Sequence, residues 1–276
     1  MKHPASFKRK DIDMIPNQRK KEKLKNIICA ITSITAFILL WQIAVTVGWI
    51  DDRACAAPSE VLSTFIDKWT NTKPDGSTLG THLLVSLKLA SLGFLVAVVI
   101  GVPMGLLMGY FKGMDAFLTP IFEIVRPIPP LAWIPVVLLT LGIGTEAKAF
   151  IIFIASFVPC VINSYTGIKR ANPVLLNVAK TAGASRWQIF FKVGIPSATP
   201  MMFTGIKISL GSAWATLVAA EMLSSSQGLG YLIQRARNLV RSDLIIVGML
   251  VIGVIGALFT LILEAVETKV APWRKK

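Results

Sequence analysis

Charge and cysteine are both scarce in this chain of 276 residues. Only 16% of the residues are charged and three are cysteines, whereas 54% are hydrophobic. A soluble domain carries roughly 25% charged residues, so the composition excludes a single soluble globule and also excludes disorder. Cys29, Cys55 and Cys160 show no CxxC spacing, and the only histidines are His3 and His82. We therefore expect no metal site and no disulfide framework, and we expect the surplus apolar surface to face lipid.

Acidic residues are half as common as basic ones, at 15 against 29, which leaves a net charge of +14. The basic residues cluster in residues 1–25, 169–192 and 269–276, and each cluster adjoins a long apolar run. Nucleic-acid binding could use such charge, but basic segments beside apolar runs are typical of the cytoplasmic side of a membrane protein. We expect no nucleic-acid partner.

Six apolar runs are long enough for a membrane helix, which needs about 20 residues. They cover residues 26–50, 83–110, 116–142, 147–168, 197–222 and 244–266. The first run exceeds the roughly 7–15 residues of a signal-peptide core, so we interpret it as a retained helix. The predicted fold class is an all-α polytopic membrane protein.

The distribution of basic residues predicts the orientation of these spans. Residues 1–25 and 269–276 form basic cytoplasmic tails, and residues 26–82 hold the first span and an acid-rich external loop. Residues 83–268 form the transmembrane core, with a cytoplasmic loop at 169–196. The external segment 224–243 breaks the pattern with three arginines, which indicate either an anion-attracting vestibule or a solvated short helix.

The third apolar run is interrupted by Arg126-Pro127-Ile128-Pro129-Pro130, with Pro135 further on. Proline breaks or kinks a helix, and broken helices at membrane depth are buried in protein or line a wet cavity. Glu123 and Arg126 beside the break either face a pathway or pair with each other three residues apart. In the second run, glycines at 101, 105 and 109 predict close helix packing.

The loop at 169–196 predicts two short helices separated by Gly183. Asn172-Pro173 is a helix-start signal, so residues 174–182 form the first helix and residues 184–193 the second. Pro196 then opens the fifth span. This element suits either a groove on a soluble partner or the surface of an anionic bilayer.

The same loop resembles the EAA loop of bacterial ABC-importer permeases. The resemblance rests on Asn177-Val178-Ala179, followed by Gly183 and, thirteen residues later, Pro196; the loop residues that it implies for ATPase coupling also include Ala184, Ser185 and Trp187. The chain departs from the family pattern at Asn177, where the family has Glu, at Val178, where it has Ala, and at Ile195, where it has Leu.

The chain is also similar, over roughly residues 55–273, to the permeases of the sulfonate, taurine, nitrate and bicarbonate group. The fragments that carry this resemblance include Ala57-Pro58-Ser59, His82 with Ser86-Leu87, Arg126 to Pro135, Ala219-Ala220-Glu221-Met222, Gly228-Leu229-Gly230-Tyr231 and Pro272-Trp273. The resemblance implies a type I importer fold in the bacterial inner membrane, a homodimer, two ATP-binding cassette subunits and an external solute-binding protein. ATP and Mg would bind the partner, because this chain has no GxxxxGK[ST] loop.

The substrate implied by the resemblance is a small, sulfonate-like anion, with a heterocyclic vitamin precursor as the alternative. Residues that could line the pathway are Glu123, Arg126, Trp133, Asn163, Tyr165 and Glu221. An autonomous ion-coupled carrier and a membrane enzyme are the competing functions. A carrier would use intramembrane carboxylates or inverted repeats, and an enzyme would need a nucleophile–base pair or an HExxH motif. We expect no catalytic residue and no cofactor in this chain.

Overall fold

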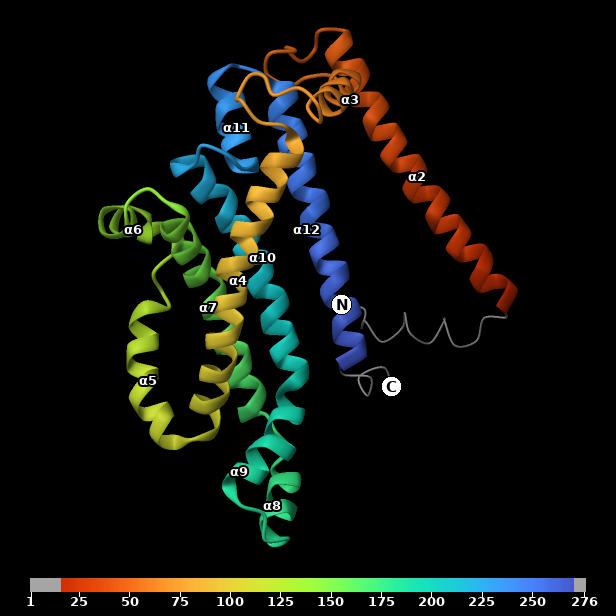
Figure 1. The fold of residues 1–276 in the computed structure, drawn as a ribbon. Helices are drawn as coiled ribbons and strands as arrows, with labels where there is room; N and C mark the ends of the chain where they lie inside the picture. The colour runs from red at the N-terminus through yellow and green to blue at the C-terminus, as the bar shows by residue number, and fades with distance from the viewer. Residues whose placement is uncertain (1–15, 271–276) are drawn as a thin grey trace. The chain divides into compact units, whose positions relative to one another are not determined.

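The computed structural model describes residues 16–270, and these residues form helices and connecting loops without a strand (Figure 1). The predicted tails at 1–25 and 269–276 fall partly outside the described residues. The chain divides into two compact units, Met1–Ser63 and Thr64–Lys276. The predicted all-helical class is confirmed.

The first unit contains α2 (Pro16–Thr46) and the start of α3 (Pro58–Asp67). Within α2, the segment Leu24–Thr46 is long and apolar enough to cross a membrane, in agreement with the first predicted span. The amide of Ser59 donates to the Gln42 side chain at 3.1 Å. The helix α3 was not predicted, because its ten residues are too few for the span criterion.

After α3, the described residues of the second unit form nine α-helices, one 3₁₀ segment (η1) and one π segment (η2). They are α4 (Leu79–Tyr110), α5 (Lys112–Val125), η1 (Pro130–Trp133), α6 (Ile134–Leu141), α7 (Thr145–Lys169), α8 (Pro173–Thr181), α9 (Arg186–Ile189), η2 (Phe190–Gly194), α10 (Ile195–Ser224), α11 (Leu229–Asn238) and α12 (Ser242–Val270). The loop with α8 and α9 precedes α10 and α11 follows it, so they mark opposite ends of this unit. We call these the loop end and the α11 end.

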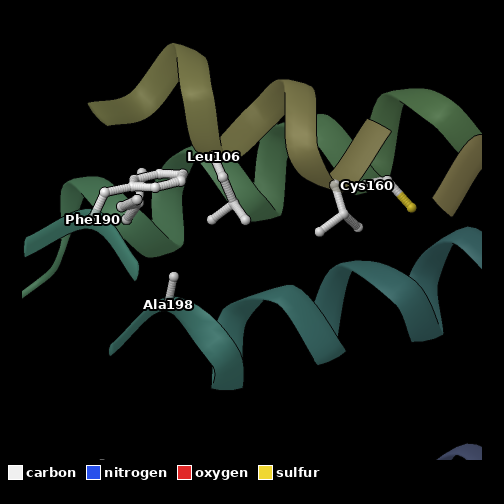
Figure 2. Close-up of a cluster of buried hydrophobic side chains, with 6 residues drawn as sticks. Leu106, Cys160, Phe190 and Ala198 are labelled. Atoms are coloured by element: carbon white, nitrogen blue, oxygen red, sulfur yellow. The ribbon is translucent and has the colours of Figure 1, made fainter. Parts of the chain in front are cut away.

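The core of the unit is the packing of α4 against α7 and α10. A side chain at Gly105 would collide with the Val161 carbonyl, and one at Gly109 would lie 2.8 Å from the Tyr165 carbonyl. These glycines let the α4 backbone approach α7 closely, which confirms the predicted packing role of the stripe. Toward the loop end, Leu106, Cys160 and Ala198 bring the three helices together in one buried cluster (Figure 2).

The third predicted span is broken, as its prolines indicated. Lys112–Val125 and Pro130–Leu141 meet at 82°. With this pair counted as one span, the described residues hold up to six spans by length and composition, of which five are single helices. The bend places Arg126 and the following prolines at the interruption.

Several predicted helix ends differ from the structure by a few residues, and two of the differences have a local physical cause. The second loop helix was expected to stop at residue 193 and a new helix to open at Pro196, but α9 continues through the π turn η2 into α10. Pro196 has no N–H for the regular α ladder, and a π turn directly before it absorbs the mismatch without ending the helix. The second span starts at Leu79 rather than 83, because Thr78 caps it by accepting from the Thr81 amide.

Candidate functional site

At the loop end, α8 presents an apolar face that none of the described residues of its unit covers. Val174, Leu175 and Val178 are more than half exposed, and Val178 reaches 61%. Val174, Asn177, Val178, Thr181 and Ala182 line an open hollow of about 560 Å³ on this helix. An apolar face held out in this way suits a partner surface.

Local capping fixes the shape of the loop. The Asn172 side chain accepts from the Val174 amide at 2.9 Å, as the helix-start signal predicted. Gly183 has φ +76° and closes α8, with its own amide bonded to Lys180 and the Ala184 amide bonded to Ala179. This is a Schellman ending, in which a residue in the left-handed region follows the helix. Ser185 then starts α9 with a capping box.

Aromatic packing ties the loop to the helical core. The Phe111 ring lies 4.8 Å from that of Trp187, and the Tyr110 ring lies 5.1 Å from that of Phe190. Phe190 itself belongs to the buried cluster with Leu106 (Figure 2). The Tyr110 hydroxyl also donates to the Arg186 carbonyl at 3.0 Å. These contacts join α9 and η2 to the end of α4 and to the start of α10.

The bend in the third span encloses the second feature, a pair of cavities that share Arg126. One cavity, of about 300 Å³, is lined by Met108, Thr119, Phe122, Glu123, Arg126, Val161, Ile162, Tyr165 and Thr166. The other, of about 380 Å³, is lined by Arg126, Ile128, Pro130, Ile154, Ala155, Val158, Pro159, Ser212, Ala215 and Thr216. The Arg126 guanidinium donates to Glu123 at 3.1 Å. The two residues thus pair with each other and also border a cavity.

The other predicted pathway residues are dispersed. Tyr165 shares the first cavity with Arg126, and its hydroxyl donates to Asp115 at 3.3 Å. Asn163 turns its amide to the Pro159 carbonyl at 2.9 Å. Trp133 ends η1, packs against the cluster around Ile134 and keeps a buried indole N–H without a partner among the described residues. The structure therefore brings together Glu123, Arg126 and Tyr165 only.

Glu221 lies at the α11 end, fully buried, in a structural role that the sequence did not reveal. Its carboxylate accepts from the Ser86 hydroxyl at 2.8 Å and from the Gly230 amide at 2.9 Å. The Leu229 amide in turn donates to the Ser86 oxygen at 2.8 Å. An acidic side chain at a helix N-terminus satisfies free amides, so Glu221 fastens α11 to α4 and α10.

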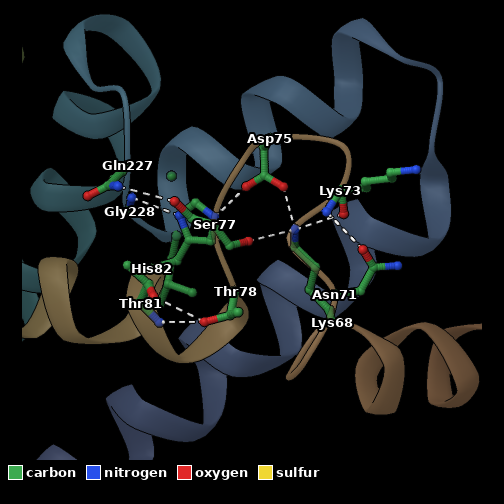
Figure 3. Close-up of polar contacts among 12 residues, drawn as sticks. Lys68, Asn71, Lys73, Asp75, Ser77, Thr78, Thr81, His82, Gln227 and Gly228 are labelled. Atoms are coloured by element: carbon green, nitrogen blue, oxygen red, sulfur yellow. Dashed lines mark hydrogen bonds and ion pairs between the residues drawn. The ribbon is translucent and has the colours of Figure 1, made fainter.

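A second buried chain of contacts holds the loop before α4 (Figure 3). Lys68 donates to the Ser77 carbonyl at 2.8 Å and pairs with Asp75, which also contacts His82 Nε2. His82 Nδ1 accepts from the Gly228 amide at 3.0 Å, so the ring proton lies on Nε2 and points to Asp75. The α11 end is thereby a rigid polar cap.

This cap predicts a large effect for Gly228→Ala. Gly228 has φ +120°, and a Cβ there would lie 2.6 Å from a carboxylate oxygen of Glu221. The strain costs about 1–3 kcal/mol, and each lost bond to the carboxylate costs about 1.5–3 kcal/mol more. We expect the melting temperature in detergent to fall by roughly 10 °C or more.

The matched control is Gly142→Ala, where φ is +73° but no atom lies within 4 Å of the new Cβ. It isolates backbone strain from collision with Glu221. Equal melting temperatures for the two variants would show that the Glu221 contact does not stabilise the cap.

Sequence reasoning missed the chemistry of this cap, although one signal was present. His82 and Ser86 are four residues apart, so they share a face of α4, and both point to the Gly228-Leu229-Gly230 turn. The spacing predicts a shared polar partner, but not which loop supplies it.

Comparison with known proteins identifies the chain. Residues 97–276 match the family described as "Binding-protein-dependent transport system inner membrane component". The chain belongs to this family. The taurine transport system permease protein TauC of Escherichia coli is 33% identical over 252 residues, which cover 90% of each protein. The nitrate import permease protein NrtB of Synechocystis sp. is 33% identical over 268 residues, covering 94% of this chain and 96% of the relative.

A solved structure of the MetNI methionine ABC transporter has a TM-score of 0.56 and 19% identity, and it covers 68% of this chain and 95% of that chain. At this identity the likeness concerns the fold alone. The predicted ABC-importer permease and its type I fold are confirmed. The chain is a membrane permease subunit of an ABC importer.

Proposed function

We propose that this permease carries a small anion through the bacterial cytoplasmic membrane, as a homodimer driven by two ATPase subunits. The observation that supports an anionic substrate is the position of Arg126, which lines both cavities at the bend. A guanidinium fork binds sulfonate, carboxylate or nitrate oxygens in pairs. The relatives named for taurine and nitrate transport support the same substrate class.

The ATPase would bind at α8 and Gly183. The exposed apolar face of α8 supplies a docking surface, and the aromatic contacts of Trp187 and Phe190 supply a stiff connection to the core. ATP and Mg²⁺ would bind the partner only. The loop end is then cytoplasmic, as are both termini, and the α11 end faces outward, which agrees with the basic residues at 169–192.

The bend also supports the homodimer. The Arg126 and Glu123 side chains are 47% and 55% exposed in a single chain. Charged groups at membrane depth face a protein interior or a wet cavity rather than lipid. A second copy would enclose the bend and complete the pathway.

Uptake by the reconstituted complex tests the function. A tagged permease should purify with an ATPase subunit. Proteoliposomes containing the complex should accumulate labelled taurine or nitrate only with Mg-ATP on the ATPase side and binding protein on the other. Uptake that follows a proton or sodium gradient without ATP would contradict an ABC importer and favour an autonomous carrier.

The role of Arg126 can be tested by substitution. We expect Arg126→Lys to reduce uptake about tenfold or more while ATPase association persists, because lysine keeps the charge but loses the paired donors. The control is Glu123→Gln, which weakens a half-exposed pair worth about 0–1 kcal/mol and leaves Arg126 in place. Equal losses in both variants would assign Arg126 to the ion pair rather than to substrate.

A further inference from the structure

The last turn of α11 and the segment that connects it to α12 are rich in arginine. Together they make up residues 235–241, which we call the arginine turn: Arg235, Ala236, Arg237 and Asn238 of the helix, then Leu239, Val240 and Arg241. Its three arginines stand at the end of the unit opposite the loop end. In a membrane protein, basic residues on the external side run against the usual topology, so their presence requires a separate reason.

Two of the three arginines of the turn have no ion-pair partner in the part of the chain that the structure describes. Arg241 pairs with Asp243, its Nε donating at 2.8 Å. Arg235 and Arg237 are exposed and form no ion pair with any acid that the structure describes. They leave an exposed positive surface at the α11 end.

The tip of the turn is apolar and strained. Val240 is 65% exposed and Leu239 is 40% exposed. Val240 has φ +54°, a left-handed conformation that a β-branched residue rarely adopts. Its amide bonds to Arg237 and the Arg241 amide bonds to Ala236, so α11 has a Schellman ending with valine where glycine is usual.

Two other helices with a Schellman ending, α2 at Gly48 and α8 at Gly183, provide the comparison. Gly183 occupies the equivalent left-handed position after α8. The arginine turn instead places a branched apolar side chain there and exposes it to solvent. An apolar centre flanked by arginines is typical of the buried middle of a protein–protein interface.

The geometry points to the arginine turn as the docking surface for an acidic face of the solute-binding protein. This inference rests on the proposed function, which places the α11 end outside. The family is described as binding-protein-dependent, so a partner must approach this side. Arg235 and Arg237 would meet carboxylates at the rim, while Leu239 and Val240 would enter an apolar recess.

The polar cap connects the arginine turn, through α11, to the helices α4 and α10. The first amides of α11 are fastened to Ser86 of α4 and to Glu221 of α10. Binding that displaces α11 therefore displaces the outer ends of both helices. The arginine turn would contact the binding protein, and the cap would transmit the movement of α11 to α4 and α10.

The test measures uptake by the reconstituted permease–ATPase complex as a function of binding-protein concentration, with substrate saturating. We expect the double variant Arg235→Glu with Arg237→Glu to raise the half-maximal binding-protein concentration about tenfold or more. The increase should be larger at low salt, where charges are less screened. Basal ATPase activity without binding protein should stay unchanged. Lys73→Glu, an exposed charge reversal in the loop before α4, is the control and should have little effect.

Val240→Gly separates docking from folding. Glycine relieves the strained backbone, so a purely structural turn would be stable and fully active. The docking surface predicts a normal or higher melting temperature together with a several-fold rise in the half-maximal binding-protein concentration. An unchanged concentration in both Val240→Gly and the double arginine variant would overturn the inference.

Further outcomes identify other roles for the arginines. A change in substrate dependence at fixed binding protein would indicate steering of the free anion. An effect that appears only in vesicles with anionic lipid would indicate headgroup binding. Either result contradicts docking. If the wild-type complex shows no binding-protein-dependent uptake at all, the proposed function fails instead.

Discussion

We expect Gly183→Asp to leave the permease in the membrane at near-normal levels and to abolish its association with the ATPase. No described atom lies within 4 Å of a Cβ built on Gly183, so the added side chain meets no collision there, and the strain of φ +76° is modest for aspartate, which tolerates the left-handed region. The new carboxylate would instead enter the contact with the partner. Burying an unpaired charge costs on the order of 3–5 kcal/mol, which corresponds to a loss of affinity of more than about a hundredfold.

Two further variants separate the backbone from the contact. Gly183→Asn retains access to φ +76°, because asparagine tolerates the left-handed region, and it adds no charge. It should keep more ATPase than Gly183→Asp in a pull-down from detergent. Gly183→Val opposes that conformation and should lose association through distortion of the loop. Full ATPase recovery with normal uptake in Gly183→Asp would remove the coupling role from this loop.

The departure of this loop from the family pattern fits the structure. Asn177 stands where the resemblance expects Glu, and its side chain lines the open hollow on α8 with Val178. The surroundings of this hollow are mainly apolar, and Val174 adds to them. If the ATPase binds here as proposed, an uncharged residue at this position would leave the contact to shape and apolar packing rather than to an ion pair.

The spans could be predicted from the sequence because lipid imposes a local rule. A helix that faces hydrocarbon needs a long apolar run, and that run can be read without knowing its neighbours. The break at Arg126 was predictable for the same reason, since proline acts on its own backbone. The helix start at Asn172 and the left-handed Gly183 follow equally local rules.

The cap at the α11 end could not be predicted, because its partners are distant in the sequence. Ser86 and Glu221 are 135 positions apart and meet only once α4 and α10 have packed. A buried carboxylate in an apolar helix is as consistent with a pathway as with a structural cap. The choice depends on the amides of the following turn, which the sequence does not position. The continuous helix from α9 through η2 into α10 was not predicted either, because a π turn before Pro196 has no sequence signal of its own.

The packing of α4 on α7 predicts the most severe structural variant, Gly105→Leu. A Cβ at Gly105 would collide with the Val161 carbonyl and lie 2.9 Å from the Ser164 Cβ. Backbone atoms on α7 cannot move aside without separating the two helices along their whole contact. Overpacking of a well-filled core costs about 1–3 kcal/mol for a few methylenes, and this collision involves backbone and a whole side chain.

We therefore expect Gly105→Leu to yield little folded permease, measured as the monodisperse fraction on size exclusion in detergent. The control is Gly253→Leu in α12, where an exposed glycine has no atom within 4 Å of the added Cβ. That variant adds the same side chain to a membrane helix and should fold normally, because leucine suits both the helix and the lipid. A Gly105→Leu protein as monodisperse as Gly253→Leu would show that α4 and α7 do not require the close approach on which the core depends.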